Sequence, residues 1–94
     1  MHGVDILLAL QTVDVAEERR RRSVQRGRSL LDALDQLKLE LVSGQPDAAA
    51  LGRLRALIAE TRLPTGDAGL DDLLAAVELR AEVEIAKRSR TPAA

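Results

Sequence analysis

A stripe of four leucines most constrains the fold of this 94-residue chain. The four are spaced four, three and four residues apart, at Leu30, Leu34, Leu37 and Leu41. Because successive residues of an α-helix are about 100° apart, these side chains lie along one narrow face of a helix. Gly27 falls close to the centre of that face, and no Pro or turn-forming cluster accompanies it. The pattern therefore predicts one unbroken helix across Gly27, with room there for a close approach by a neighbouring helix.

The rest of the chain predicts an all-α fold, a small antiparallel bundle of three main helices plus a short N-terminal helix. A connection is expected at residues 12–15, because Asp14 and Glu17 have the spacing of a capping box at the start of the long helix. Ser43 and Gly44 are expected to close that helix, with the glycine in the left-handed conformation. The expected organisation is a short apolar helix and connection over residues 1–14, a helical bundle over 15–88 and a frayed tail over 89–94.

Two further helices are expected, over about residues 47–62, with Asp47 near the cap, and about residues 68–88. The second should pack through one apolar face, formed by Ala50, Leu54, Leu57 and Ile58. The third is apolar on two sides: one face comprises Leu70, Leu73, Leu74, Val77, Ala81 and Ile85, and the other comprises Ala75, Ala76, Leu79, Val83 and Ala86. Such a helix is normally covered on two sides, so its second face should either pack under the N-terminal segment or contact another molecule.

An apolar segment near the N-terminus, residues 4–11, has five large aliphatic side chains among its eight residues. Such a segment promotes aggregation if it stays exposed, so we expect it to dock either on its own bundle or in a groove of a partner. This segment and the second face of the third helix supply six candidate partner-binding residues: Leu7, Leu8, Leu10, Leu79, Val83 and Ala86.

The composition excludes several classes of function. The chain has no Cys, which excludes disulfides, thiol catalysis and thiolate metal sites. Its 14 basic and 15 acidic residues nearly cancel, so no global charge draws it to nucleic acid or anionic lipid. The longest uninterrupted apolar run, residues 6–10, is far shorter than the roughly 20 residues that span a membrane. No membrane span and no cofactor are therefore expected.

The strongest local charge is a run of four arginines, Arg19, Arg20, Arg21 and Arg22. Consecutive helical residues step about 100° apart, so the run winds around the helix and forms no single basic face. Glu17 and Glu18 lie four residues before Arg21 and Arg22 and are expected to pair with them. A solvated face is therefore favoured over nucleic-acid binding through residues 19–28, and contact of the four arginines with an acidic protein surface is a further alternative.

No constellation of residues predicts catalysis or a metal site. The single histidine, His2, lies at an expected loose end. Asp32 with Asp35 and Glu78 with Glu82 have helical spacing but lie outside the apolar stripes, so they are expected to be solvated acids. Small all-helical chorismate mutases use Arg and Glu inside a helical dimer, but no polar residue falls at an expected core position here. The chain is therefore not expected to be an enzyme.

Three segments, each a weak signal alone, make a distinctive combination when they occur together in this order. They are VDILLALQ near the N-terminus, EERRRRSVQRGRSLLDALDQLKLELVSG through the long helix, and GLDDLLAAVELRAEVEIAK in the third helix. Together they resemble the FliX family of alphaproteobacterial flagellar assembly regulators. The similarity covers about residues 4–87 and is weakest over residues 45–67.

This resemblance implies a non-enzymatic cytoplasmic regulator that couples early basal-body assembly to transcription of later flagellar genes. It implies that the chain binds FlbD, an enhancer-binding transcription activator, and sets its activity. It also implies association with the inner membrane, which for a chain without a membrane span would be peripheral. Two alternatives stay open: a structural homodimer in which the same apolar surfaces meet, and a nucleic-acid binder that uses the arginine run.

Overall fold

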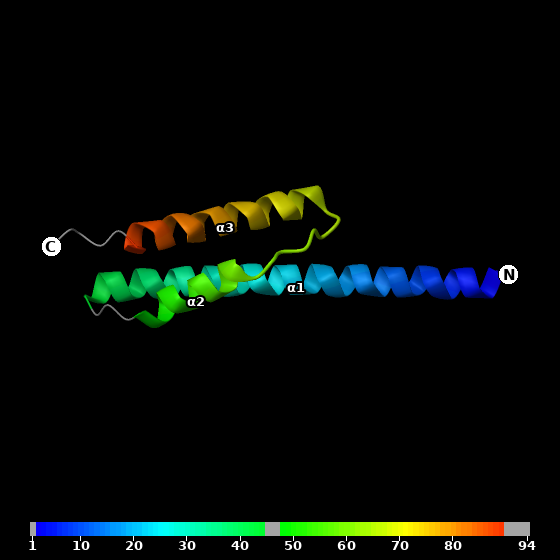
Figure 1. Ribbon diagram of the computed structural model, residues 1–94, viewed down its shortest axis with the longest axis horizontal. Helices are drawn as coiled ribbons and strands as arrows, with labels where there is room; N and C mark the ends of the chain where they lie inside the picture. The colour runs from blue at the N-terminus through cyan, green and yellow to red at the C-terminus, as the bar shows by residue number, and fades with distance from the viewer. Residues whose placement is uncertain (1, 45–47, 90–94) are drawn as a thin grey trace.

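Three α-helices make up the computed structural model, which describes residues 2–44 and 48–89. They are α1 (His2–Ser43), α2 (Ala48–Ala59) and α3 (Ala68–Ser89), and no strand occurs within these two ranges. Helix α2 returns along α1, and α3 packs against both and runs in the same direction as α1 (Figure 1). The expected all-α fold is confirmed, although α2 is shorter than predicted because it ends at Ala59.

Helix α1 continues without a break through the connection expected at residues 12–15. The hydroxyl of Thr12 donates a hydrogen bond of 2.9 Å to the carbonyl oxygen of Leu8, so this polar side chain is satisfied within the helix. Asp14 caps no helix, because it lies in the interior of α1. The separate helix expected over residues 1–14 is therefore not formed.

Two glycines of the first helical segment act as the sequence predicts. Helix α1 passes through Gly27, where a Cβ atom would lie 2.6 Å from Cδ2 of Leu74, so the missing side chain lets α3 pack closely. Gly44 follows α1 with a φ of 71°, the left-handed conformation that ends many helices. The stop expected at Pro46 and the cap expected at Asp47 lie outside the described residues.

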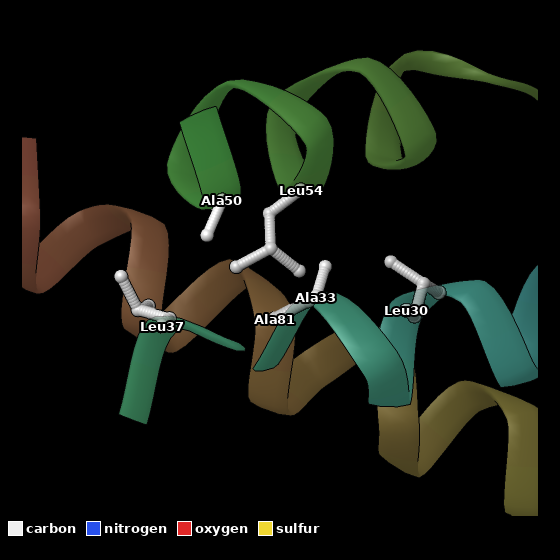
Figure 2. Close-up of a cluster of buried hydrophobic side chains, with 6 residues drawn as sticks. All are labelled: Leu30, Ala33, Leu37, Ala50, Leu54 and Ala81. Carbon is white, nitrogen blue, oxygen red and sulfur yellow. The ribbon is translucent and has the colours of Figure 1, made fainter. Parts of the chain in front are cut away.

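The core lies where the three helices meet and is built from Leu and Ala. Its buried members are Leu30, Ala33, Leu37, Ala50, Leu54 and Ala81 (Figure 2). Partly buried side chains pack against them, as the stripes predict: Leu34, Leu57, Ile58, Val77 and Ile85. The predicted burial of two residues is wrong, since Leu41 is 52% exposed and Leu73 is 61% exposed. Leu41 lies in an open groove between the ends of α1 and α3, and Leu73 lies at the edge of its stripe.

The N-terminal half of α1 extends beyond the other two helices (Figure 1). We call residues 3–22 the arm, because every one of them is exposed. Its large aliphatic side chains are each between 52% and 62% exposed: Val4, Ile6, Leu7, Leu8, Leu10, Val13 and Val15. The expectation that the apolar N-terminal segment packs on its own bundle is therefore wrong.

The start of α3 is fixed by two aspartates. Oδ1 of Asp67 accepts a hydrogen bond of 3.1 Å from the backbone N–H of Leu70, which is the bond made by an N-cap residue. Oδ1 of Asp71 accepts a hydrogen bond of 3.0 Å from the backbone N–H of Thr65, which ties the preceding turn to the helix. Apart from Ser89, which ends α3, the tail expected to fray lies outside the described residues.

Candidate partner-binding surfaces

The second apolar face of α3 is open to solvent. Leu79 is 61% exposed and Val83 is 42% exposed, and Ala86 is also exposed. The opposite side of the helix carries Leu74 and Ala81, which are buried against α1 and α2. Burial of that inner side fixes the rotation of α3, so the second face points outward as a consequence of core packing. We call this surface, formed by Ala75, Ala76, Leu79, Val83 and Ala86, the outer face of α3.

The outer face of α3 has the shape and composition that suit contact with another helix. Its three alanines have short side chains, which permit close approach of a partner backbone, while Leu79 and Val83 project between them. Charged side chains border one edge: Oε1 of Glu84 lies 3.4 Å from Nζ of Lys87 and 3.7 Å from Nε of Arg80. An apolar strip with a charged border is typical of a surface that binds an amphipathic helix.

The arm carries the other three candidate residues but does not gather them into one surface. Leu7, Leu8 and Leu10 are all exposed, and their spacing distributes them around α1. The arm extends past α2 and α3, whereas Leu79 and Val83 belong to α3, which lies beside the C-terminal half of α1 (Figure 1). The six predicted residues therefore do not share one binding site: three lie on the outer face of α3, and three are distributed around the arm.

The arginine run lies at the base of the arm. Glu18 accepts hydrogen bonds from Arg21 at 2.9 Å and from Arg22 at 3.2 Å. The expected pair of Glu18 with Arg22 is confirmed, while Arg21 pairs with Glu18 and not with Glu17 as expected. Arg19 and Arg20 form no ion pair with any residue that the structure describes. These two cations are thus free to contact an acidic group of another molecule.

A groove opens where the arm meets the bundle. One wall comes from α1 and includes Val15, Arg19 and Arg22, and the other comes from the loop after α2 and includes Arg62 and Leu63. Aliphatic carbon and guanidinium groups therefore border the same space. The lining also includes the carboxylates of Asp14, Glu18 and Glu60, so the groove borders aliphatic, basic and acidic groups together.

Arg26 is largely buried, so the prediction that it lies on a solvated basic face is wrong. Its side chain is only 9% exposed. Nε donates to the carbonyl oxygen of Leu57 at 3.1 Å and Nη2 donates to that of Glu60 at 3.1 Å, so the guanidinium satisfies carbonyls at the C-terminal end of α2. Arg26 lies four residues before Leu30, on the edge of the leucine stripe, which is the sequence signal that could have placed it inside.

Glu78 joins Arg26 to α3 and is also buried more than the sequence predicted. Its Oε1 lies 3.0 Å from Nη1 of Arg26 and close to Nε of Arg62, while Arg62 donates to Asp71 at 3.0 Å. Oε1 thus lies between two guanidinium groups without the geometry of a directed hydrogen bond to either. The prediction of a core without polar residues is wrong here. The guanidiniums already bind main-chain and carboxylate oxygens of the bundle, so the cluster holds the three helices together.

The described residues show no group of three or more His, Cys, Asp or Glu side chains that could hold a metal ion. Among the helices described, none is both long enough and apolar enough to cross a membrane. The exposed surfaces in this part of the chain include the outer face of α3, the arm and the open grooves.

Comparison with known proteins identifies the family. The profile of the class II flagellar assembly regulators, FliX, matches residues 1–89. The chain belongs to the FliX family of class II flagellar assembly regulators. The flagellar assembly protein FliX of Caulobacter vibrioides is 42% identical over 70 residues, which are 74% of this chain and 49% of that protein. The chain thus spans about half the length of this FliX relative. No solved structure matches the chain.

Proposed function

We propose that this chain is a non-enzymatic regulator of flagellum assembly that binds and modulates an FlbD-like enhancer-binding transcription activator. Through this contact it couples basal-body assembly to flagellar gene expression. Membership of the FliX family supports a role in flagellar assembly. The choice of a protein partner rests on one observation, the uncovered outer face of α3.

The contact with the activator uses Leu79, Val83 and Ala86. These side chains lie on successive turns of a helix whose other side is fixed by the core, so the surface needs little reorganisation before it binds. The partner segment is an amphipathic helix, whose apolar side chains pack between Leu79 and Val83. Burial of two branched aliphatic side chains contributes about 1.5–3 kcal/mol each at most, so neighbouring contacts add to the affinity.

This function needs no catalytic group. The buried polar cluster of Arg26, Arg62 and Glu78 is occupied by contacts within the bundle, which leaves it a structural role. The site of action is the cytoplasm, where an activator meets DNA, with peripheral association at the inner membrane through proteins of the basal body. The absence of a membrane-spanning helix among those described is compatible with this location.

Isothermal titration of the purified chain into the activator tests the proposal. A chain with Leu79→Lys and Val83→Glu should lose measurable binding, because both substitutions place charge at the centre of the contact. Leu73→Lys is the matched control, since Leu73 lies on the same helix with the same 61% exposure as Leu79 but outside the outer face. Far-ultraviolet circular dichroism should show that all three chains keep their helices. Equal affinity of the double variant and the wild type would overturn the assignment of this surface.

A further inference from the structure

We propose that the arm pairs in an antiparallel direction with the arm of a second copy of this chain. The two-fold axis of the resulting dimer passes near Thr12. The dimer is a separate property from activator binding, because the arm and the outer face of α3 are different surfaces (Figure 1).

The arm lacks the packing that normally stabilises a helix. It is about 30 Å long at 1.5 Å per residue, and the described parts of α2 and α3 cover none of it. An isolated helix of this length is only marginally stable in water, and most helical stability in proteins comes from tertiary packing. The arm also exposes seven large aliphatic side chains, which a monomer normally covers. A second helix packed along the arm supplies this tertiary packing and covers two of these aliphatic side chains, Leu8 and Val15.

The sequence of one face of the arm specifies the direction of pairing. Asp5, Leu8, Thr12, Val15 and Arg19 follow each other at intervals of three, four, three and four residues, the spacing of a coiled-coil seam. On either side of Thr12 the seam has an aliphatic residue and then a charged one. Val15 and Arg19 follow Thr12, and Leu8 and Asp5 precede it, so the two ends of the seam carry opposite charges. An antiparallel pair centred on Thr12 therefore places each Asp5 opposite Arg19 of the other copy.

Charge complementarity favours this arrangement over a parallel one. Asp5 and Arg19 form no ion pair with other residues in the described part of the chain, so both are available. A parallel pair would place the arginine run of one copy against the same run of the other, and like charges in contact disfavour that arrangement. In the antiparallel pair Leu8 packs against Ala16 of the other copy, and Val15 packs against Ala9. These alanines lie beside the seam and leave space for the larger side chains.

The antiparallel pairing also places the start of each arm at the base of the other. With Thr12 at the axis, the residues opposite Arg22 and Arg19 are residues 2 and 5 of the other copy. The first turn of one arm therefore reaches the groove at the base of the other, where half-exposed Leu63 lies beside these arginines. Contact along both arms and both grooves buries on the order of 1,000 Å² or more, which is the size that a specific interface needs.

Sedimentation velocity at micromolar concentration tests the dimer. The wild-type chain should sediment as a dimer, and Leu8→Lys should raise the dissociation constant at least about tenfold. Leu79→Lys is the control, because it adds the same charge at a similarly exposed leucine of α3 and should leave the dimer intact. Asp5→Arg should weaken the dimer, and adding Arg19→Asp should restore it. A monomeric wild type, or a double variant weaker than Asp5→Arg alone, would overturn the proposal.

Disulfide cross-linking tests the direction, and the absence of native Cys makes every new thiol unique. Thr12→Cys should cross-link two copies, because residues at the axis lie close enough for a disulfide. Asp5→Cys alone should stay uncross-linked, whereas Asp5→Cys combined with Arg19→Cys should cross-link. Cross-linking by Asp5→Cys alone would indicate a parallel pair. Efficient cross-linking by Val13→Cys, on the opposite side of the arm, in place of Thr12→Cys would show that another face pairs. Either result refutes the arrangement.

Discussion

The close approach of α3 to α1 at Gly27 predicts opposite outcomes for the same substitution at two helical glycines. Gly27→Ala and Gly52→Ala both gain about 0.8–1.0 kcal/mol of helix propensity. At Gly52 the new methyl group meets no atom within 4 Å, so the chain should be stabilised by about that amount. At Gly27 the methyl group would lie 2.6 Å from Cδ2 of buried Leu74. Overpacking of this kind costs about 1–3 kcal/mol, so Gly27→Ala should be neutral or destabilising by up to about 2 kcal/mol.

Urea denaturation followed by circular dichroism at the helical band measures both variants, since the chain has no aromatic residue for fluorescence. The two free energies of unfolding should differ by about 1–3 kcal/mol, with Gly52→Ala the more stable. In a Leu74→Ala background the obstacle is removed, so Gly27→Ala should become stabilising there. Equal stabilisation by both substitutions in the wild-type background would show that Leu74 does not pack on Gly27. The position of α3 across α1 would then be wrong.

Three further predictions concern the polar groups. Arg26→Met removes the guanidinium that binds carbonyls of α2 and Glu78, and should lower the free energy of unfolding by about 2–3 kcal/mol. Arg20→Met, at an exposed cation, should change it by less than about 0.5 kcal/mol in the same urea titration. Asp67→Ala should lower the thermal midpoint through loss of about 1 kcal/mol of N-cap stabilisation, whereas Glu82→Ala should not. Because the arginine run winds around α1, a gel-retardation assay at low salt should show no DNA complex, and a complex that dissociates steeply with salt would contradict this.

Helical periodicity predicted which face of each helix is buried and which is exposed. The stripe at Leu30 and Leu37 is buried, Leu54 is at the centre of the core, and Leu79 and Val83 are exposed on the second side of α3. These features depend on spacing within one segment, which the sequence displays directly. The continuity of α1 through Gly27 was predictable for the same reason.

Contacts between segments could not be predicted in this way. Arg26 on α1 and Glu78 on α3 are 52 positions apart in sequence, and only packing of α3 against α1 makes them partners. From local spacing alone both resemble solvated charges. Leu41 and Leu73 lie on predicted core faces but stay exposed, because Leu41 lies in an open groove near the end of α1 and Leu73 lies at the edge of its stripe. Burial at the edge of a face depends on the angles between helices, which one sequence does not specify.

The break expected at residues 12–15 shows the limit of cap signals. Asp14 and Glu17 have the spacing of a capping box, but the same residues are tolerated inside a helix. No Gly or Pro interrupts this stretch, and the hydroxyl of Thr12 binds the carbonyl oxygen of Leu8. The continuous helix converts the apolar N-terminal segment from a packed element of the bundle into an exposed arm.

The most direct test of the contact between α3 and an activator is a nuclear magnetic resonance footprint. The chain is labelled with nitrogen-15 and the unlabelled activator is added while the backbone amide signals are followed. The largest changes should centre on Leu79 and Val83 and extend to Ala75 and Ala86, with little change at the core residue Leu30. Binding that alters the arm or the α2 loop while these α3 signals stay unchanged, or no binding at all, would contradict the proposed function of this surface.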